Sequence, residues 1–463
     1  MSGGATGPTV LKFGGTSVED AAAFERVAGI VRAALAARPV VVTSAMSRMT
    51  DALLGAVRLA SEGDVEGARA GLAPHLDRHV TVAESFLAAE GVAEARATVE
   101  DARRRIGGLL EVIAEHPGTR ASLRDEVVSY GERLSSAVLA MALRARGIPA
   151  RWVDARACVR TDEEHGRAAP LPDPTGECTR RELGPLVEAG EVPVLGGFIG
   201  SAPSGATTTL GRGGSDYTAA LVGAALEARE IQIWTDVTGF LTADPRVVPG
   251  ARRIGHLSYE EAAELAYFGA KVLHPKTIQP AVEREVPVRI CNSRAPEAGG
   301  TLIDARAEPL PGGVRAIAHK TGVTIVRVSS ARMLGAYGFL RALFEVFARH
   351  RTAVDVVTTS EVSVSLSLEE TEALHAIVAE LRELGEVQVE GGNAIVCVVG
   401  AGLRGTPGVA GRVFQTIPDI NVGLISQGAS GVNLTFVVEE ARVVETVRRL
   451  HASFFEAEEE AGT

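Results

Sequence analysis

The sequence predicts an α/β protein in which helices sandwich a mostly parallel sheet, followed by two small α+β units. Three observations support this fold class. Residues 9–43 read as strand, glycine pair, helix and strand, which is the order of a parallel βαβ unit. Strand and helix patterns alternate again after residue 150. Residues 362–368 (VSVSLSL) then alternate strictly between apolar and polar, as a half-buried antiparallel strand does.

The first elements of the chain are well marked. Residues 9–13 form a short strand that ends at a glycine pair, a helical stretch covers about 18–37, and residues 39–43 form a continuous apolar strand. The next part of the chain is rich in Ala, Glu, Arg and Leu, with apolar residues three and four positions apart. This spacing predicts several amphipathic helices without strands between them. We therefore expect a helical insertion at about residues 51–120.

The sheet continues with four further strand candidates, which helical segments separate. They cover residues 151–153, 192–199, 231–234 and 286–290. Residues 294–314 are rich in proline and glycine, a composition that marks a domain boundary.

Two similar runs of short elements follow this boundary. The first run has a strand at 323–328, a helix at 338–349, strands at 353–358 and 362–368, and a helix at 371–384. The second run has a strand at 394–399, a helix at 408–416, strands at 421–426 and 432–437, and a helix at 441–451. This weak internal repeat predicts two small α+β units.

The composition argues against several classes of protein. The net charge of −11 and the lack of a basic run argue against nucleic acid as a partner. No apolar run approaches the roughly 18 residues of a membrane span, and no signal pattern opens the chain. We therefore expect a cytoplasmic protein with no membrane partner. The four cysteines are far apart, which predicts reduced thiols and no metal held by the protein. They are Cys158, Cys178, Cys291 and Cys397.

The phosphate loop GxxxxGK[ST] and the HRD and DFG motifs of protein kinases do not occur in the sequence. The segment KFGGTS at 12–17 offers another way to bind phosphate. Lys12 closes a strand, the glycine pair lets the backbone approach a ligand, and N–H groups at the following helix start bind anions. A plain strand–turn–helix with an exposed Lys12 explains the same pattern equally well.

A second loop, TTTLGRGGSD at 207–216, places one arginine among glycines ahead of a helix. Arg212 would clamp a carboxylate through two parallel hydrogen bonds. Ser215 or Asp216 would cap the helix. A flexible loop with a helix cap explains Asp216, but it gives no reason for the arginine.

Three further patterns are ambiguous when taken singly. A strand ends in Thr235 and Asp236 ahead of a loop that ends at Arg246, and α/β proteins bind nucleotides at the ends of parallel strands. A turn begun by Asp-Pro explains this loop as well. Lys271 follows a helix with a capping-box start, and it either binds a ligand or stabilises the helix dipole. Glu132 lies on a helix, where a lone glutamate is usually a surface residue.

Taken together, these motifs resemble the aspartate kinase family over nearly the whole chain. They occur in the family's order and spacing, and the helical insertion looks most like the lysine-sensitive, single-function branch. The motifs are KFGGTSV at 12–18, SYGERLS at 129–135, TTTLGRGGSD at 207–216, WTDVTGFLTADPR at 234–246, FGAKVLHP at 268–275, TTSEVS at 358–363 and ISQGAS at 425–430.

This resemblance implies an amino-acid-kinase fold followed by two ferredoxin-like ACT domains, which are βαββαβ units that bind amino acids. It implies a catalytic domain at 1–305, a first ACT domain at 315–390 and a second at 391–463. In the family the second ACT unit is expected to be inserted in the first. The last strand and helix are then candidates to complete the first unit.

The implied reaction transfers the γ-phosphate of ATP to the β-carboxylate of L-aspartate, with Mg²⁺, and gives 4-phospho-L-aspartate. It is the first step towards lysine, threonine and methionine. The attacking carboxylate is already ionised near neutral pH, so no general base is needed. The difficulty is charge, because a carboxylate must approach a polyphosphate. Catalysis would therefore rest on cationic groups and on alignment, and the sequence offers Lys12, Arg212 and Lys271.

The resemblance also implies roles for single residues. Lys12 would stabilise the transferring phosphoryl group, and Asp216 would assist its positioning. Arg212 would bind the α-carboxylate of aspartate, and Glu132 its α-ammonium. The remaining substrate contacts would come from Ser44, Phe198, Thr209, Gly213 and Ser215. The nucleotide would be held by Lys12, Gly14, Gly15, Ser17, Thr235, Asp236, Leu241, Arg246 and Lys271. Many family members have tyrosine where Leu241 stands, so a hydroxyl contact is lost there.

For regulation, the resemblance implies an effector pocket between the ACT units of two subunits. A homodimer follows from this, with a tetramer as the larger alternative. The pocket residues would be Met333, Gly338, Phe339, Val354, Asp355, Thr359, Ser360 and Glu361. Asp355 would pair with the effector's ammonium. Ala336 and Ala353 stand where lysine would call for small polar residues, so lysine is the first expectation and threonine the second.

Other functions stay open at this point. One is a kinase of the same fold for glutamate, acetylglutamate or UMP, against which the ACT pair and the TTTLGRGGSD loop argue. Another is a catalytically silent ACT sensor, which would have no need for Lys12, Glu132, Arg212 and Lys271. We expect no fused homoserine dehydrogenase, because the 463-residue chain stops after the ACT region.

Overall fold

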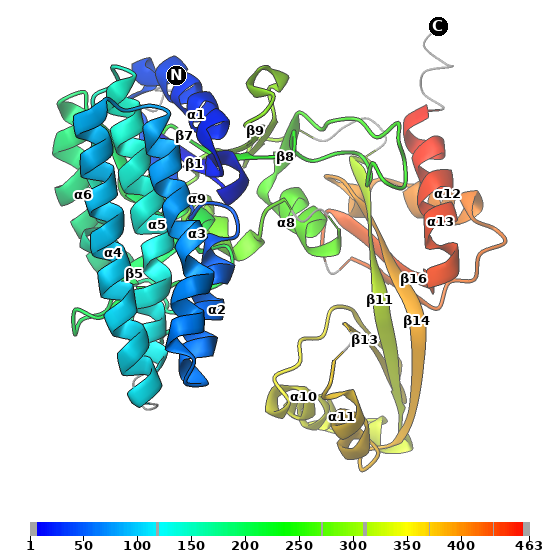
Figure 1. Ribbon diagram of the computed structural model, residues 1–463. Coiled ribbons are helices and arrows are strands. Elements are labelled where there is room, and N and C mark those ends of the chain that lie inside the picture. The colour runs from blue at the N-terminus through cyan, green and yellow to red at the C-terminus, as the bar shows by residue number, and fades with distance from the viewer. Residues whose placement is uncertain are drawn as a thin grey trace, which may run out of the picture. The chain divides into compact units, whose positions relative to one another are not determined.

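The computed structural model describes residues 7–116, 120–269, 272–308, 313–369, 371–428 and 430–456. The chain forms two compact units (Figure 1). The first unit contains the chain up to Phe240 and the segment Val272–Ala305. The second contains the segment that begins at Leu241 and the chain from Arg306 onward.

The first unit is built on a mostly parallel sheet. Its strands lie in the order β3 (Ala150–Val153), β4 (Val192–Gly196), β2 (Val40–Thr43), β1 (Thr9–Phe13), β7 (Glu230–Thr235), β9 (Val288–Asn292) and β10 (Thr301–Asp304). Neighbouring strands are parallel except for β9 and β10. The central strands β1, β2 and β4 are buried along their whole length, as the apolar runs predict for a sheet covered on both faces.

Helices connect these strands in the order that the sequence predicts. They are α1 (Ala21–Ala33), α6 (Pro172–Glu188), α7 (Gly214–Ala225) and α9 (Gln279–Glu283), with short turns η1 (Gly15–Val18), η2 (Leu35–Ala37), η4 (Ala155–Ala157), η5 (Pro275–Ile278) and η6 (Pro296–Ala298). The Asp20 side chain accepts a hydrogen bond from Ala23 N at 2.8 Å, which caps the start of α1.

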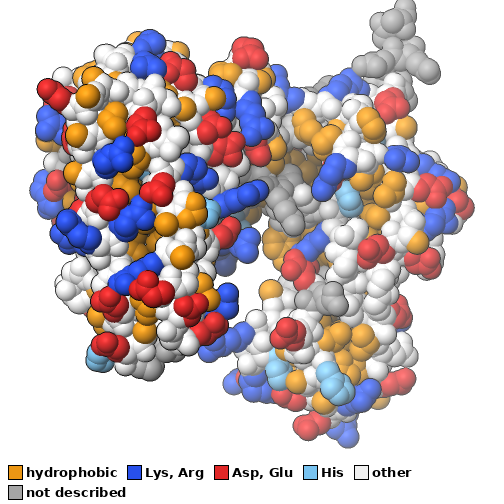
Figure 2. Space-filling view, viewed as in Figure 1, with side chains coloured by type: hydrophobic (Ala, Val, Ile, Leu, Met, Phe, Trp, Pro, Cys, Tyr) orange, Lys and Arg blue, Asp and Glu red, His pale blue; other side chains and the backbone are white. Residues whose placement is uncertain are grey.

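Four long helices occupy the region where the sequence predicts a helical insertion. They are α2 (Met49–Ser61), α3 (Val65–Glu84), α4 (Ala89–Glu115) and α5 (Arg120–Ala145), and they lie alongside one another (Figure 1). Leu53, Leu76, Ile106 and Leu110 are among the side chains fully buried between them. The outward faces of α4 and α5 carry interspersed acidic and basic side chains (Figure 2).

The strand expected at 192–199 is interrupted in the structure. β4 ends at Gly196, and a short strand β5 (Ile199–Ser201) then pairs with β6 (Thr207–Thr209) as a separate hairpin. Phe198 separates β4 from β5 with a left-handed φ of 67°, a conformation that a strand does not have. Because such a backbone is strained for a bulky residue, this corner is a candidate functional position.

The second unit contains an antiparallel six-stranded sheet. Its order is β12 (Val357–Thr359), β13 (Ser363–Glu369), β11 (Ala316–Ser329), β14 (Glu386–Val399), β16 (Asn433–Glu439) and β15 (Leu424–Gln427). β11 and β14 are longer than the sequence predicts and pair with each other along most of their length (Figure 1). Its helical elements are α10 (Phe339–Arg349), α11 (Leu374–Leu381), α12 (Val409–Thr416), α13 (Val443–His451), η7 (Ala331–Met333), η8 (Leu403–Gly405), η9 (Glu440–Arg442) and the π-helix η10 (Ala452–Glu456).

Two separate cores lie on this sheet. One joins the end of β11 to β13, α10 and α11 through Val326, Leu343, Leu366 and similar residues. The other joins the start of β11 to the end of β14, α12, β16 and α13. The last strand and helix thus share a core with the start of β11 and with 394–420. We propose on this basis that the first ACT unit is inserted in the second, which is the reverse of the expected order.

The segment that begins at Leu241 also differs from the expected boundary at residue 305. Ala243, Val247 and Val248 are buried in the same core as Ile317 and β16. This segment includes β8 (His256–Ser258) and α8 (Tyr259–Phe268). Its apolar side chains therefore contribute to the core of the second unit, although in sequence it lies inside the expected catalytic domain.

The start of α8 is fixed by a capping box and a buried ion pair. Ser258 Oγ accepts from Glu261 N, and Glu261 accepts from Ser258 N, as the spacing predicts. Arg315 Nε donates to Glu261 Oε1 at 2.9 Å, and the Glu261 side chain is fully buried. Ala401 N donates to the same oxygen at 2.7 Å. Strand ends of the C-terminal sheet thereby hold the first turn of α8.

No described helix has both the length and the apolar composition needed to cross a bilayer.

Candidate active site

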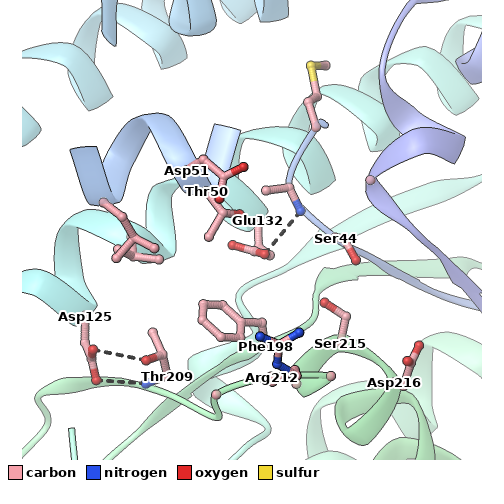
Figure 3. A pocket seen from close by; sticks show the side chains of 18 of the residues that line it. Ser44, Thr50, Asp51, Asp125, Glu132, Phe198, Thr209, Arg212, Ser215 and Asp216 are labelled. Carbon is pink, nitrogen blue, oxygen red and sulfur yellow. Dashed lines mark hydrogen bonds between the residues drawn. The ribbon is translucent and has the colours of Figure 1, made fainter. Parts of the chain in front are cut away.

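A cavity of about 580 Å³ opens at the carboxyl ends of β1, β2 and β4 in the first unit. Its wall is formed by the loop and first turns after β2, by α5 and by the loop that leads into α7 (Figure 3). Ten residues with predicted site roles line it. They are Lys12, Gly15, Ser44, Glu132, Phe198, Thr209, Arg212, Gly213, Ser215 and Asp216.

Lys12 and Asp216 form an ion pair at this end of the sheet. Lys12 Nζ lies 2.7 Å from Asp216 Oδ1, and their side chains are 11% and 15% exposed. Lys12 comes from β1, and Asp216 comes from the first turn of α7. A Cβ on Gly15 would lie 2.9 Å from Ala45 O, so only glycine lets the loops after β1 and β2 approach this closely.

Glu132 places a carboxyl group with one free oxygen in the cavity (Figure 3). Its Oε1 accepts a hydrogen bond from Ala45 N at 3.2 Å, and its Oε2 is buried with no partner in the part of the chain that the structure describes. Burial raises the pKa of Glu132 to about 8. A buried acceptor without a partner costs free energy, so its persistence indicates a ligand donor at this place.

The loop from 207 to 216 carries an arginine without a carboxylate partner. Arg212 is exposed and forms no ion pair within the described chain. Gly211 and Gly213, on either side of it, have left-handed φ angles of 76° and 72°. A Cβ on Gly213 would come within 2.6 Å of Thr277 Cγ2. Glycine is therefore required to bring Arg212 to the cavity.

Sequence reasoning missed Asp125, which lies in α5 and also lines the cavity. Its side chain is 1% exposed, and its carboxylate accepts hydrogen bonds from Thr209 N and Thr209 Oγ1, each at 3.0 Å (Figure 3). A signal for it did exist. Asp125 and Glu132 are seven residues apart, so two turns of one helix bring them to the same face.

Two further arginines of the cavity wall were also missed. Arg48 is exposed, has a left-handed φ of 67° and makes no ion pair within the described ranges. Arg124 lies beside Asp125, with Arg124 Nη2 3.5 Å from Asp125 Oδ1. With Lys12 and Arg212, the described residues of the wall include four cationic side chains, which suits a ligand or ligand pair with several negative charges.

Several residues predicted to hold the nucleotide lie outside this cavity. Ser17 is buried, and its hydroxyl lies 2.8 Å from Ser293 Oγ, so it stabilises the loop after β1. Gly14 N donates to Trp234 O at 3.1 Å. Thr235 Oγ1 donates to Asp236 Oδ1 at 3.2 Å at the end of β7.

Leu241 and Arg246 belong to the second unit. There Arg246 forms an ion pair with Asp244 at 2.6 Å, and its own side chain is 87% exposed. This arrangement leaves most of the guanidinium open to solvent. Lys271 lies outside the described residues.

The predicted effector residues gather near the start of α10 and near β12. The carboxylate of Asp355 has partners within the chain. Lys320 Nζ lies 3.0 Å from Asp355 Oδ2, and the Tyr267 hydroxyl donates to Asp355 Oδ1. Burial and this bond raise the pKa of Tyr267. An effector ammonium would have to displace these donors.

The remaining effector candidates are more open. Gly338 has a φ of 84° and precedes α10, and Ser360 Oγ lies 2.8 Å from Ser363 Oγ. Glu361 is exposed. The other predicted positions in this region are Met333, Phe339, Val354 and Thr359.

Comparisons with known proteins agree with this architecture. The amino acid kinase family model matches residues 7–292, and an ACT domain model matches residues 396–454. The lysine-sensitive aspartokinase 3 of Escherichia coli is 40% identical, over 96% of this chain and 99% of its own length.

Two solved structures of E. coli aspartokinase III also match. One, in complex with aspartate and ADP, has a TM-score of 0.81 at 39% identity and covers 97% of this chain and all of its own. The other, in complex with lysine and aspartate, has a TM-score of 0.81 at 40% identity and covers 97% of this chain and 99% of its own. The chain therefore belongs to the amino acid kinase family and, within it, to the aspartokinases.

Proposed function

We propose that this chain transfers the γ-phosphate of ATP to the β-carboxylate of L-aspartate in the cavity around Lys12 and Glu132. The observation that carries this proposal is the free Oε2 of Glu132 in a cavity that Arg212 also lines. An α-amino acid offers an ammonium and a carboxylate, and this pair of charges matches a buried carboxylate and an exposed guanidinium.

The reaction itself demands little proton chemistry. The β-carboxylate attacks the γ-phosphorus, the bond to the bridging oxygen of ADP breaks, and the electron pair leaves with ADP. Lys12 is placed to neutralise the phosphoryl oxygens as their charge develops. Asp216, 2.7 Å from Lys12, fixes the ammonium at the strand end. We assign Ser44, Phe198, Thr209, Gly213 and Ser215 to contacts with aspartate.

The nucleotide contacts are proposed from the loops at the strand ends. Gly14 and Gly15 let backbone N–H groups approach a phosphate, and Ser17 holds this loop through Ser293. Thr235, Asp236, Leu241, Arg246 and Lys271 complete the proposed nucleotide set. The described residues contain no group of three or more His, Cys, Asp or Glu suited to a metal. Mg²⁺ fits best as a partner of the ATP phosphates, where it supplies charge neutralisation.

For regulation we propose lysine as the effector, with threonine as the second candidate, bound at an ACT-mediated dimer with a tetramer as the larger form. The E. coli relative is called lysine-sensitive, and one of its structures is in complex with lysine. At this place in the chain Asp355 would accept a hydrogen bond from the effector's ammonium. We also propose that the protein is cytoplasmic and that the pathway served is amino-acid biosynthesis.

The test is an ATP-dependent hydroxamate assay on the full-length protein with Mg²⁺. Hydroxylamine traps an acyl phosphate, so we expect a signal with aspartate, none with glutamate, and a lower signal when lysine is added. Signal with glutamate or another acid would favour a different kinase of this fold. No signal with any acid, from folded protein, would favour a silent amino-acid sensor.

The variants Arg212→Lys and Glu132→Gln test whether these two residues bind aspartate. A lysine keeps the charge but loses the two-pronged hydrogen bonding to a carboxylate. We expect each variant to raise the KM for aspartate at least tenfold while leaving the KM for ATP within about twofold. Glu188→Gln on the exposed end of α6 is the matched control and should change neither KM.

A further inference from the structure

Asp125 is the most completely bonded carboxylate of the cavity wall. Its Oδ2 accepts from Gly166 N at 2.8 Å and from Thr209 N at 3.0 Å. Its Oδ1 accepts from Thr209 Oγ1 at 3.0 Å, and His165 Nδ1 lies 3.3 Å from Oδ2. The side chain is 1% exposed. One buried group thus ties α5 to the end of β6 and to the loop that holds Gly166.

These bonds fix the direction of one proton. An ionised carboxylate only accepts hydrogen bonds, whereas a hydroxyl donates one and accepts through its lone pairs. Because Thr209 Oγ1 donates its proton to Asp125, it has only lone pairs left for any other partner. Thr209 also lines the cavity. A ligand that meets this oxygen must therefore be a donor.

We propose that Asp125 is a positioning residue for aspartate specificity, which makes Thr209 Oγ1 an acceptor for the substrate's ammonium alongside Glu132 Oε2. This inference rests on the proposed function and deepens it. At neutral pH the ammonium is the one hydrogen-bond donor of aspartate, since both carboxylates are ionised. Dicarboxylates without an amino group, such as succinate, have no proton to donate to Thr209 Oγ1 or to Glu132 Oε2, so neither acceptor gains a donor.

Asp125→Asn provides a change of polarity with little change of shape. Two backbone N–H groups point at the Oδ2 position, so the amide oxygen of asparagine must occupy it. The amide NH₂ is then forced to the Oδ1 position, where it donates to Thr209 Oγ1. The Thr209 hydroxyl proton turns away from residue 125 and repels an ammonium. Arg124 beside Oδ1 is 40% exposed and has room to move.

The decisive experiment is a double-mutant cycle on the full-length enzyme with the hydroxamate assay. We expect Asp125→Asn to raise the KM for aspartate about tenfold or more, with kcat and the KM for ATP within about twofold. Thr209→Val, which removes the acceptor, should raise the KM similarly, and Thr209→Ser should not. In the Thr209→Val background, Asp125→Asn should add nothing. The same rise in both backgrounds would mean a structural role and would overturn the proposal.

Inhibition by succinate supplies a readout that does not need a folded Asp125→Asn protein. If Thr209 accepts a hydrogen bond from the ammonium, Thr209→Val weakens the binding of aspartate but not that of succinate. The preference of the enzyme for aspartate over succinate then falls. If Thr209 instead donates to a carboxylate, Thr209→Val weakens the binding of both ligands equally, and the proposal is wrong. A wild-type enzyme that fails to phosphorylate aspartate would refute the proposed function. An active wild type with unchanged Thr209→Val would refute this inference alone.

Discussion

At the scale of single residues, burial of the Glu132 carboxyl group in the substrate-free protein costs free energy. The residue is 3% exposed, and one carboxyl oxygen has no hydrogen-bond partner among the described residues. In the substrate-free protein, burial makes the neutral form the favoured one near neutral pH, since the pKa lies at about 8. The ionised form needs a cation beside it, and the substrate's ammonium is the cation that fits.

This cost should lower the free energy of unfolding at high pH. The unfolded carboxyl titrates near its usual value of 4.5, whereas the folded one titrates at about 8. Because the folded pKa is the higher one, the contribution of Glu132 to the free energy of unfolding is fully present below pH 4.5. It is lost as the pH rises through about 8. We therefore expect Glu132→Gln to raise the free energy of unfolding above pH 8 by on the order of a few kcal/mol, with a matching rise in Tm. At pH 4.5 the substitution should change both quantities little.

Differential scanning calorimetry at these two pH values measures the effect. The exposed Glu188→Gln is the control and should show no pH-dependent gain. A Glu132→Gln protein that is less stable than wild type at pH 8.5 would show that Glu132 is already compensated in the free protein.

The same titration should control substrate binding. Because the ionised carboxylate binds the ammonium, the free enzyme must lose the Glu132 proton first. We expect kcat/KM for aspartate to rise with pH and to level off above about 8, where Glu132 is ionised. The profile of kcat alone should be shifted to lower pH, since bound ammonium favours ionisation. Initial rates across pH test this, and a flat kcat/KM profile would contradict it.

At the scale of elements, the loop between β6 and α7 depends on its glycines. Gly213 has a φ of 72°, and an added Cβ would clash with Thr277 at 2.6 Å. Gly205, in the β5–β6 turn, has a φ of 83° with open space around its added Cβ. Both substitutions by alanine incur the left-handed backbone cost of about 1 kcal/mol. Only Gly213→Ala must also displace the loop.

We therefore expect Gly213→Ala to raise the KM for aspartate several-fold beyond any effect of Gly205→Ala, because Arg212 precedes the displaced residue. Steady-state kinetics of the two variants, with their Tm values, separate the clash from the backbone cost. Equal kinetic parameters in both variants would show that the loop absorbs the clash without moving Arg212.

A second element-scale feature is the attachment of α8. Its first turn is held by Arg315 through Glu261, and Tyr267 near its end binds Asp355. Lys320 Nζ lies 4.8 Å from the centre of the Tyr267 ring and 3.0 Å from Asp355 Oδ2. Because Arg315 and Asp355 hold the two ends of α8, this helix can respond to whatever binds Asp355.

Tyr267→Phe tests this attachment. If an effector ammonium competes for Asp355, removing the hydroxyl removes one competing donor. We expect the concentration of lysine that gives half-inhibition to fall by up to about tenfold, as for a hydrogen bond to a charged group. The KM values without effector should stay within about twofold. Unchanged or weaker inhibition would mean that the effector does not displace Tyr267.

At the scale of the whole molecule, the segment that begins at Leu241 precedes residue 305 in sequence but packs in the core of the second unit. Ala243, Val247 and Val248 are buried against residues of the C-terminal unit, including Ile317. A chain cut after residue 305 would expose them. Each valine contributes about 1.5–3 kcal/mol when fully buried, and the buried Glu261 would also lose Arg315.

We therefore expect a 1–305 fragment to be less stable than the full chain and prone to aggregation, rather than an independent kinase. Thermal unfolding and size-exclusion chromatography of the fragment measure this. A soluble 1–305 fragment with the Tm of the full chain would show that the segment from Leu241 does not need the C-terminal core.

Much of the fold and of the site is predictable because its signals are local. The βαβ order, the helical insertion and the glycine loops follow from periodicity and composition within short windows. Most predicted substrate residues line one cavity because parallel strands end at one edge of their sheet. Asp125 was not predicted, because its one signal, the spacing of seven residues from Glu132 on one helix, has meaning only once Glu132 is known to face the cavity.

The sequence by itself determined the class of the fold, the order of its elements and the motifs that contain Lys12, Glu132 and Arg212. Only the tertiary structure decided which distant groups meet: Asp125 with Thr209, and Asp355 with Tyr267 and Lys320. The physical reason is that these two kinds of interaction act over different distances along the chain. Local propensity acts over a few residues, whereas the burial of a carboxylate and the choice of its donors depend on packing between elements far apart in the chain.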